Sequence, residues 1–458
     1  MKKMTLIFLC FVILRANGQG SWQLIPNVPA ANFDVFSISV VNAQTVWAVA
    51  DTFTALSSSL AGTVPQVLRT TDGGATWQTH RVYIAADRLA WDIHGLDELT
   101  AIFTTNQFNS SDNKPIFKTS DGGLTWKKIV PPNNTGGVFI HFFNSKEGIV
   151  INRNKASTTT DGGETWSLVP ASNFPTFATD EYNLLYTTGN FVGHFGDRLW
   201  YGTSKGRIMR SLDRGNHWQA AQVAGPDENI QSIAFSDSLH GIALATGNIN
   251  FNYPISLIYA TSDGGDTWTL EESAPLGDAQ VVTAVPEAKN VFFFGTIVES
   301  NDSPSFIAHT NNIHDPLAWS QLPPDSVYIN SFDFHSPTVG FAFGASDKLE
   351  DRVNIGNLLF RRKYFYKWVG TVLSSDEVLN KKTSKISPNP AHDFLKIDFD
   401  NPNNGKALML TITSTTGQII FSKETSDNKL DISMLSPGMY IIKIESDQDQ
   451  VVEKFLKY

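Results

Sequence analysis

Short apolar segments and polar turns alternate along most of the chain. Pairs of apolar segments flank a polar turn at Val35–Ala50, Ile140–Ile151, Ile230–Ala245 and Ile329–Gly344. Short apolar segments joined by turns are typical of strands, whereas helical periodicity is scarce. The pattern therefore predicts pairs of short antiparallel strands that recur along the chain.

A turn motif follows the strand pairs and ends on tryptophan. Its best copies read as TTDGGATW and its variants, and two degraded copies end at Trp319 and Trp368. The tryptophans recur about every 50 residues, a period that marks propellers and similar arrays. With strands on both sides of the turn, each repeat has about four strands, so the sequence predicts an all-β fold with a propeller of about seven blades. The five good copies occupy residues 70–77, 119–126, 159–166, 211–218 and 261–268.

Trp22 leaves the closure of the ring open. Its segment SWQLIP resembles the strand that follows a turn motif. It is expected to pair with the last blade, in which case the strand at Trp368 is displaced or leads into a linker. The sequence does not choose between these arrangements.

The turn motif has a structural explanation. Its aspartate can accept backbone N–H bonds from the turn that follows, and its second glycine can adopt a positive φ at little cost. Its tryptophan can pack on the neighbouring repeat and bury a large area. Five copies argue against catalysis, because a catalytic site is normally made once. The residues assigned this structural role are Asp72, Gly74, Trp77, Asp121, Gly123, Trp126, Asp161, Gly163, Trp166, Asp213, Gly215, Trp218, Asp263, Gly265 and Trp268.

The N-terminus has the pattern of a signal peptide. Lys2 and Lys3 precede the apolar run Thr5–Leu14, and Ala16-Asn17-Gly18 supplies small residues for cleavage. We therefore expect residues 1–18 to be removed. The single cysteine, Cys10, lies within this segment, so the expected mature protein has no disulfide and no thiol chemistry.

Charge and composition exclude several partners. The chain has 458 residues, of which 45 are acidic and 35 basic, giving a formal net charge of −10. An acidic chain without a basic cluster is a poor binder of nucleic acids or anionic lipid surfaces. The apolar run near the N-terminus is too short to cross a membrane, which takes about 20 apolar residues, and no later segment is long enough.

The pattern changes after residue 373. Residues 374–384 are polar and indicate a linker, and residues 385–458 contain a new set of predicted strands. The propeller is accordingly assigned to residues 19–373, and a small antiparallel β-sandwich to residues 385–458. The strands expected there are Phe394–Phe399, Leu408–Thr413, Gln418–Ser422, Lys429–Ile432 and Met439–Ile444.

Two parts of the chain resemble known families. The C-terminal segment carries Pro388, Asn389, Pro390, Gly417, Gly438, Tyr440 and Lys454 in this order. With these residues, residues 385–458 resemble the sorting domain of the type IX secretion system of Bacteroidetes. This resemblance implies passage across the outer membrane with the type IX machinery as partner, and a secreted or cell-surface location. With the repeated turn motif, residues 19–373 resemble Asp-box (BNR) propellers, in particular those like photosystem II assembly factors, a resemblance that is specific for fold and weak for function.

Candidate catalytic groups are scattered. A glycosidase needs two carboxylates about 5–9.5 Å apart across its substrate, and acids expected on loops are Asp92, Asp180, Glu181, Asp227 and Glu228. A sialidase would need an arginine triad, yet Arg69, Arg207 and Arg210 precede turn motifs as part of the repeat. Tyr201 is a tyrosine candidate without a sequence partner. The histidines show no H-E-x-x-H or H-x-H spacing, so neither a metal nor a cofactor is predicted.

A ligand face is expected opposite the turn motifs. The longest insertions are assigned to loops between the second and third strands of blades, which project on that face. They carry Asn106, Phe108, Asn250 and Tyr253, and such rings and amides suit a glycan or protein ligand. The sequence thus predicts a non-catalytic binding or scaffold module, with an extracellular glycoside hydrolase as the alternative. The insertions are Asp51–Gln66, Thr104–Pro115, Pro170–Trp200, Thr246–Pro254, Thr296–Ser305 and Gly344–Gly356.

Overall fold

The chain divides into two compact units, Met1–Ser375 and Asp376–Tyr458, in a computed structural model. Each unit is described by itself. The described residues are 20–25, 33–52, 65–82, 84, 89–106, 114–135, 137, 139–152, 154–182, 191–226, 228–247, 255–271, 279–295, 307–310, 319–322, 327–346, 352–355, 358–361, 363–370, 385–387, 391–398, 408–414, 419–427, 429–445 and 450–457.

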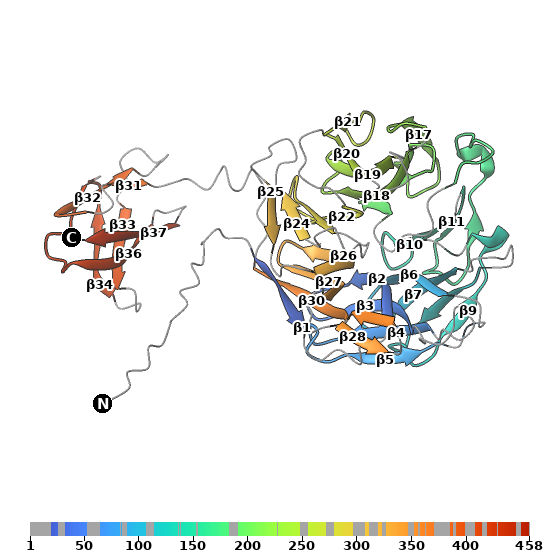
Figure 1. The fold of residues 1–458 in the computed structure, drawn as a ribbon, viewed down its shortest axis with the longest axis horizontal. Coiled ribbons are helices and arrows are strands. Elements are labelled where there is room, and N and C mark those ends of the chain that lie inside the picture. The colour runs from blue at the N-terminus through green and yellow to red at the C-terminus, as the bar shows by residue number, and fades with distance from the viewer. Residues whose placement is uncertain are drawn as a thin grey trace. The chain divides into compact units, whose positions relative to one another are not determined.

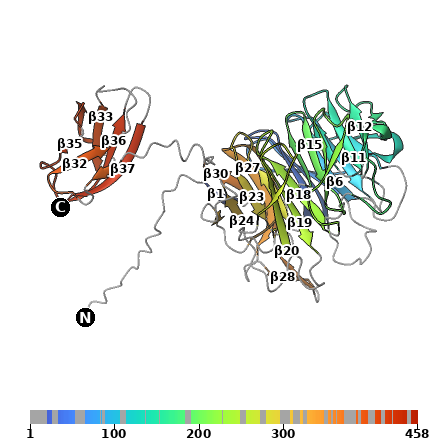
Figure 2. The same cartoon turned by 90° about the horizontal axis from the view of Figure 1, so that it is seen from above.

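The described part of the first unit contains seven four-stranded antiparallel sheets, arranged in a ring as blades (Figure 1). The all-β prediction is confirmed. Six blades use four strands in sequence order, with the first strand at the centre, and Figure 2 shows β18, β19 and β20 of one blade. Their strands are β2 (Phe33–Val40), β3 (Val46–Thr52), β4 (Pro65–Thr70) and β5 (Gln78–Arg81); β6 (Leu89–Gly95), β7 (Ala101–Asn106), β8 (Ile116–Thr119) and β9 (Lys127–Ile129); β10 (Phe139–Phe142), β11 (Gly148–Asn152), β12 (Lys155–Thr159) and β13 (Ser167–Leu168); β14 (Val192–Phe195), β15 (Arg198–Gly202), β16 (Arg207–Ser211) and β17 (Gln219–Gln222); β18 (Asn229–Phe235), β19 (Gly241–Gly247), β20 (Ile255–Thr261) and β21 (Thr269–Leu270); and β22 (Val281–Ala284), β23 (Phe292–Gly295), β24 (Ile307–Thr310) and β25 (Trp319–Leu322).

The last blade is completed by the start of the chain. It contains β26 (Val327–Ser336), β27 (Val339–Ser346) and β30 (Lys363–Val369), and β1 (Ser21–Ile25) adds its fourth strand. Trp22 pairs with Trp368 in this closure, and their rings meet edge to face at 5.4 Å. Trp368 therefore lies in a third strand, so its interpretation as a degraded turn tryptophan is wrong, because Trp22 takes that place. A hairpin of β28 (Arg352–Ile355) and β29 (Leu358–Arg361) lies between β27 and β30.

Apolar packing between neighbouring blades forms the core. Trp47 and Trp200, in the second strands β3 and β15, are fully buried. The turn tryptophans extend this packing, and Trp77 of the first blade stacks on Phe365 of the last with ring centroids 4.4 Å apart. Seven blades can thus form one ring without a disulfide, since each blade buries its faces on two neighbours. Two short 3-10 helices, η1 (Pro132–Asn134) and η2 (Ala171–Asn173), lie in connections.

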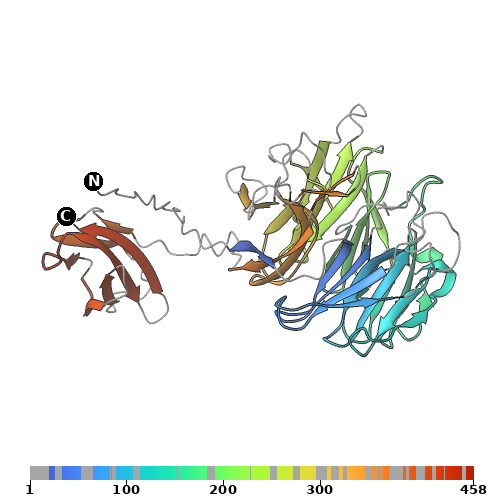
Figure 3. The same ribbon diagram turned by 60° about the horizontal axis from the view of Figure 1, so that its bottom comes forward.

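The second unit is built from two antiparallel sheets (Figures 2 and 3). One has the order β31-β32-β35 and the other β34-β33-β36-β37. Leu395 and Leu430 of the first sheet share a core with Leu410, Ile442 and Ile444 of the second. The strands are β31 (Lys385–Ser387), β32 (Phe394–Asp398), β33 (Leu408–Ser414), β34 (Ile419–Thr425), β35 (Lys429–Asp431), β36 (Gly438–Glu445) and β37 (Gln450–Lys457). Among the described residues of both units, no helix is long and apolar enough to cross a membrane.

Candidate functional site

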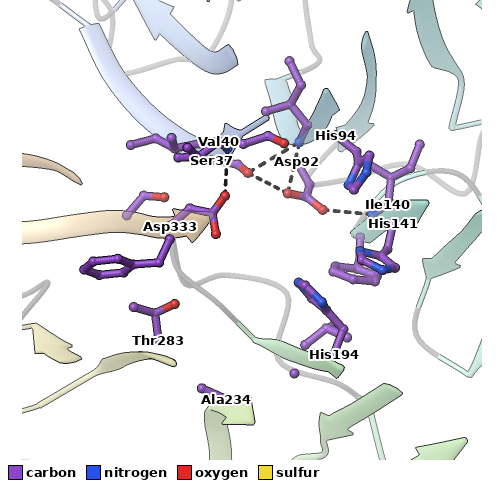
Figure 4. Close-up of a pocket in the computed structure, with 18 of the residues that line it drawn as sticks. Ser37, Val40, Asp92, His94, Ile140, His141, His194, Ala234, Thr283 and Asp333 are labelled. Carbon is purple, nitrogen blue, oxygen red and sulfur yellow. Dashed lines mark hydrogen bonds between the residues drawn. The ribbon is translucent and has the colours of Figure 1, made fainter. Parts of the chain in front are cut away.

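A cavity of about 510 Å³ runs along the axis of the ring. Residues of the first strands of all seven blades line it, from β2, β6, β10, β14, β18, β22 and β26 or directly beside them. Figure 4 shows Asp92, Asp333, His141 and His194 around this central channel. First strands face the channel because only one of their edges pairs within the blade, so the other edge points toward the axis.

That unpaired inner edge explains why polar side chains line the channel. Backbone N–H groups on a free strand edge need acceptors, and side chains of the preceding blade supply them. Asp92 Oδ2 accepts the N–H of Ile140 at 2.9 Å, and Asp333 Oδ2 accepts the N–H of Val40 at 2.8 Å. Two serines act in the same way: Ser39 Oγ accepts the N–H of Gly95 at 3.0 Å, and Ser232 Oγ accepts the N–H of Val282 at 3.0 Å.

The two channel carboxylates ionise with difficulty. Burial raises the pKa of Asp92 to about 6, although Ser37 Oγ and the N–H groups of Ile140 and Ile93 favour its charged form. Burial also raises the pKa of Asp333 to about 7, and the charge of Asp92 adds to this effect. Their charge state therefore changes close to neutral pH.

Three histidines of consecutive blades also line the channel, and His94 lies two residues after Asp92 in β6 (Figure 4). The ring of His141 lies with its centroid 4.1 Å from that of His194 and 5.1 Å from that of His94. Burial lowers the pKa of His94 to about 3 and that of His194 to about 4, and it lowers the pKa of His141 as well. All three imidazoles are therefore neutral at physiological pH. No group of three or more metal-ligating side chains in the described part of the chain is arranged to hold a metal ion.

Aromatic residues of four consecutive blades lie near the end of the channel where the first strands begin. Phe36, Trp91 and Phe139 lie in the first strands β2, β6 and β10, and Phe191 directly precedes β14. Phe36 stacks on Trp91 with ring centroids 5.6 Å apart, and Phe191 meets Phe139 edge to face at 6.5 Å. We call these four residues the aromatic mouth.

Backbone bonds place the turn motifs on the face of the ring where the first strands end. Gly73 N–H binds the carbonyl of Gln44, in the β2–β3 turn, at 2.9 Å, and Gly122 N–H binds that of Leu99 in the β6–β7 turn at 2.9 Å. Turn motifs therefore lie where first strands end. The aromatic mouth, where first strands begin, opens on the opposite face, which is the face that the sequence assigned to ligand binding.

The aspartates of the turn motifs share one hydrogen-bond pattern. Asp72 Oδ1 accepts the hydroxyl of Thr70 at 2.8 Å and the N–H of Thr76 at 2.8 Å. These bonds, led by that from the Thr76 hydroxyl, lower the pKa of Asp72 to about 2. Both glycines of the turn, Gly73 and Gly74, have positive φ. The same bonds recur around Asp121, Asp161 and Asp263 and, with a serine and a histidine in place of the threonines, around Asp213.

The structure separates most of the acids that were candidates for catalysis. Asp92 was expected on a loop, but it lies in β6, because the channel edge needs an acceptor there. Exposed Asp180 pairs with Lys205 at 2.7 Å, and buried Glu181 pairs with Arg207 at 2.9 Å. Glu228 accepts the hydroxyl of Tyr259 at 3.0 Å, and Asp227 lies outside the described residues. Of the named acids that the structure describes, only Asp92 lines the channel.

The arginines and tyrosine of the sialidase hypothesis do not meet in a site. Arg69 lies over the Trp47 ring at 5.3 Å and reaches the Gly122 carbonyl of the next turn motif at 3.4 Å. Arg210 reaches the Gly264 carbonyl in the same way at 3.3 Å. Tyr201 is fully buried, and its hydroxyl has no hydrogen-bond partner among the described residues. None of these four residues, Arg207 included, lines the channel.

One loop assignment is wrong. Pro170–Trp200 does not join a second to a third strand; it leads from the fourth strand β13 of one blade into β14 and β15 of the next. The insertion is long because η2 and the following residues cover the joint between these blades, where Phe174 stacks on Trp218 at 5.7 Å. The other five insertions do join second to third strands. Of their candidate ligand residues, Asn106 ends β7, whereas Phe108, Asn250 and Tyr253 lie outside the described residues.

The sorting residues are described in part. Tyr440, in β36, donates its hydroxyl to the Ser436 carbonyl at 2.9 Å and stacks on Phe455 at 5.7 Å. Gly438 begins β36, and Lys454 pairs with Ile441 across β36 and β37. Pro388, Asn389, Pro390 and Gly417 lie outside the described residues.

Sequence reasoning missed most of the channel. Asp333, His94, His141 and His194 were not singled out, and neither was the aromatic mouth. A usable signal existed in the repeat: Ser39, His94, His141 and Asp333 lie in the same region of four first strands, shortly before the turn to the second strand. Comparing repeats for polar residues at apolar positions would have found them.

Comparison with known proteins separates the two units. Residues 385–458 match the family described as a secretion system C-terminal sorting domain. A curated xyloglucanase of a Paenibacillus species is 24% identical over 247 residues, an alignment that covers 44% of this chain. The chain spans only 23% of the length of that relative.

Solved structures resemble the propeller in fold. One is YCF48 bound to a D1 peptide, 13% identical with a TM-score of 0.48, covering 77% of this chain and 97% of that one. Another is the GH74 xyloglucanase from Xanthomonas campestris, 10% identical with a TM-score of 0.48, covering 82% of this chain and 59% of that one. Similarity at this level carries no argument about activity. The sequence match is specific at the C-terminus, so residues 385–458 are a secretion-system C-terminal sorting domain, carried after a β-propeller.

Proposed function

We propose that the chain is an exported, non-catalytic binding module. Its ligand enters the aromatic mouth of the central channel, on the face opposite the turn motifs. The sorting domain carries the propeller to the cell surface or the medium, where the mouth meets its ligand. The mature protein begins near Gln19 and ends before Lys385.

One observation carries the non-catalytic part of this proposal: the channel carboxylates accept bonds that hold neighbouring blades together. Asp92 accepts the N–H groups of Ile140 and Ile93 and the hydroxyl of Ser37. A hydrolase needs a pair of carboxylates free to face substrate and water, whereas a carboxylate bonded in this way is held in place by the ring. The aromatic rings, in contrast, offer contact area for a ligand at the mouth.

A glycoside hydrolase is the second candidate. Two observations favour it: Asp92 and Asp333 line one cavity, and both have raised pKa values, as acid catalysts often do. The aligned Paenibacillus protein is called a xyloglucanase. Under this alternative Asp333 would act as the acid and Asp92 as its partner.

A panel of glycans and peptides, scored for both binding and turnover, tests the choice. Binding without turnover, weakened by Phe36→Leu and unchanged by Asp180→Asn, is the expected result. Asp180 is a matched control because it is an exposed acid whose partner Lys205 lies away from the channel lining. Turnover that disappears in both Asp92→Asn and Asp333→Asn would replace the proposal with the hydrolase.

Export is tested separately by mass spectrometry of the protein recovered from medium and cell surface. The expected polypeptide lacks residues 1–18 and the sorting domain. Recovery of the intact chain from the cytoplasm would contradict the export part of the proposal and leave the channel to be judged by the panel.

A further inference from the structure

The charge of the channel lining has one sign. Among the described residues that line it are two aspartates and four histidines, but neither lysine nor arginine. The histidines are His94, His141, His194 and His335. Basic side chains of the third strands, such as Arg69 and Lys367, reach turn motifs of neighbouring blades instead. An anionic ligand would therefore meet two carboxylates and no opposing charge.

His94, His141 and His194 add hydrogen-bond acceptors to this negative charge. A neutral imidazole has one nitrogen that accepts a hydrogen bond. His141 is 9% exposed and lines the cavity. Its ring lies against the rings of neighbouring residues, and its nitrogens form no hydrogen bond with another described residue. The channel thus presents carboxylate and imidazole acceptors around one cavity (Figure 4).

The aromatic mouth complements a positive charge as well. The face of an aromatic ring is the negative side of its quadrupole and attracts cations within about 6 Å. Phe36 and Phe191 are only partly buried, so parts of their rings remain open to the cavity that they line. A hydrocarbon chain can pack on the same rings.

We propose that the channel binds an organic cation, with an alkylammonium group near Asp333 and Asp92 and its hydrocarbon part against Phe36 and Phe191. This rests on the proposed binding function and names its ligand class. Asp333 is the principal charge partner, because the bonds to Ser37 and to two backbone N–H groups already engage both oxygens of Asp92.

Titration of the carboxylates gives the interaction a pH dependence. The pKa values of about 7 for Asp333 and about 6 for Asp92 mean that both carboxylates are largely protonated at pH 5 and ionised at pH 8. His94, His141 and His194 stay neutral across this range because burial lowers their pKa values. His335 is the fourth histidine of the lining and lies two residues after Asp333. An alkylammonium should therefore bind more weakly at pH 5 than at pH 8.

The experiment uses three probes of equal chain length with the full-length protein: n-hexylammonium, 1-hexanol and hexanoate. Titration calorimetry at pH 8 should show binding of n-hexylammonium at least about tenfold tighter than of 1-hexanol, the difference expected when a charge meets a partly desolvated carboxylate and a ring face. Hexanoate should not bind. Equal binding of the cation and the alcohol would overturn the proposal.

Two substitutions locate the site. Asp333→Asn keeps an oxygen for the Val40 N–H but removes the charge, so we expect n-hexylammonium affinity to fall about tenfold and its pH dependence to shrink. Asp180→Asn, which removes an acid outside the channel, should change neither. Unchanged affinity in Asp333→Asn would refute the assigned site, whether or not the probe binds elsewhere.

The outcomes distinguish this proposal from the function on which it rests. If a glycan or peptide of the panel binds with sensitivity to Phe36→Leu while n-hexylammonium does not bind, the binding module stands and the cation class is wrong. If the panel instead reveals turnover that depends on Asp92 and Asp333, the binding module itself is wrong.

Discussion

The propeller places aspartates in two regions with opposite electrostatics. In the turn motifs, hydrogen bonds from neighbouring hydroxyl and N–H groups lower the pKa values of Asp72, Asp121, Asp161 and Asp263 to about 2. In the channel, burial raises the pKa of Asp92 to about 6 and that of Asp333 to about 7. The same residue type is thus fully charged on one face of the ring and near its titration point along the axis.

The pKa values of the two sets of aspartates differ because of their access to solvent and not because of the number of hydrogen bonds that they accept. Asp92 accepts three bonds from Ser37, Ile93 and Ile140, comparable to a turn aspartate, yet loss of water outweighs them. Turn aspartates keep access to water, so their bonds determine the shift. A repeated hydrogen-bond pattern at the surface therefore indicates architecture, whereas a carboxylate held in a cavity indicates a place where a ligand can change its charge.

The largest effect is expected from removing a channel acceptor. Asp92→Ala leaves the Ile140 N–H without its partner on the inner edge of the ring, which should cost about 2–3 kcal/mol of unfolding free energy. Asp92→Asn keeps one acceptor oxygen and should cost less. Denaturant unfolding followed by tryptophan fluorescence measures both, since all eleven tryptophans lie between Trp22 and Trp368 and report the propeller alone. Equal losses for the two variants would mean that the Ile140 bond does not set the stability.

The pH dependence of stability should separate the two regions. The folded-state pKa values of Asp92 and Asp333 exceed the unfolded value of 3.8, so their contribution is complete below pH 3.8 and is lost as the pH rises through 6 and 7. Turn aspartates behave oppositely: their contribution is present above the unfolded value and is lost as the pH falls toward 2. The buried histidines His94, His141 and His194 act against the carboxylates, because their pKa values are lowered in the fold and the unfolded chain takes up protons at these positions as the pH falls below 6.5. We therefore expect the unfolding free energy to fall between pH 8 and pH 5, with protonation of Asp92 and Asp333 reducing the loss. Denaturant unfolding at the two pH values measures the change.

Asp333→Asn supplies the control for this measurement. It removes one of the two channel carboxylates that take up a proton as the pH falls from 8 to 5, so the loss of stability at pH 5 should become larger. A curve identical to that of the unaltered protein would show that another group controls the dependence.

A turn substitution should act on stability without reaching the channel. Asp263→Ala removes the acceptor of the Thr261 hydroxyl and the Thr267 N–H, and we expect a loss of about 1 kcal/mol because these partners can turn to water. Binding of n-hexylammonium should remain within twofold of the unaltered protein. A loss of binding without a change in stability would give this aspartate a functional role instead.

The smallest expected effect concerns the contact from one blade to the turn of the next. Lys367 donates to the Gly73 carbonyl at 3.1 Å, joining the last blade to the first. Lys367→Met keeps the apolar stem and should cost about 0.5 kcal/mol, as for other partly exposed polar contacts. Denaturant unfolding checks the value. A loss as large as that of Asp92→Ala would mean that contacts to the turn motifs stabilise the packing of neighbouring blades as much as the channel hydrogen bonds do.

The features that recur along the chain could be predicted from the sequence, whereas the closure of the ring, which occurs once, could not. The turn motif recurs with Asp, Gly and Trp at fixed spacing, so the all-β propeller followed from the pattern, whereas the sorting domain was predicted from the resemblance of residues 385–458 to a known family. Trp368 misled because its spacing fits the repeat, although it lies in a third strand opposite Trp22. Spacing along a chain cannot reveal that its first strand completes its last blade.

The channel was out of reach for a different reason. Its lining comes from short parts of seven first strands. In the sequence, each polar residue of the lining looks like an ordinary interruption of an apolar segment. His94, His141 and His194 are distant in sequence, and only ring geometry brings them together. Asp92 was named among five acids, but nothing in its neighbourhood distinguished it from Asp180, which the structure places in an exposed ion pair.

The pairing of β1 with β30 sets the order in which the propeller can be completed. Six blades need only strands that are close in sequence, whereas the seventh needs Trp22 from the beginning of the chain beside Trp368 at the end of the propeller. Pairing across so long a loop is slow compared with the formation of local hairpins. Until it happens, the outer edge of β30 has unpaired backbone groups and apolar rings, which invite association with another chain. The strand that precedes all others in the propeller therefore completes the ring last, and a mature chain that lacked β1 would leave the ring open at this seam.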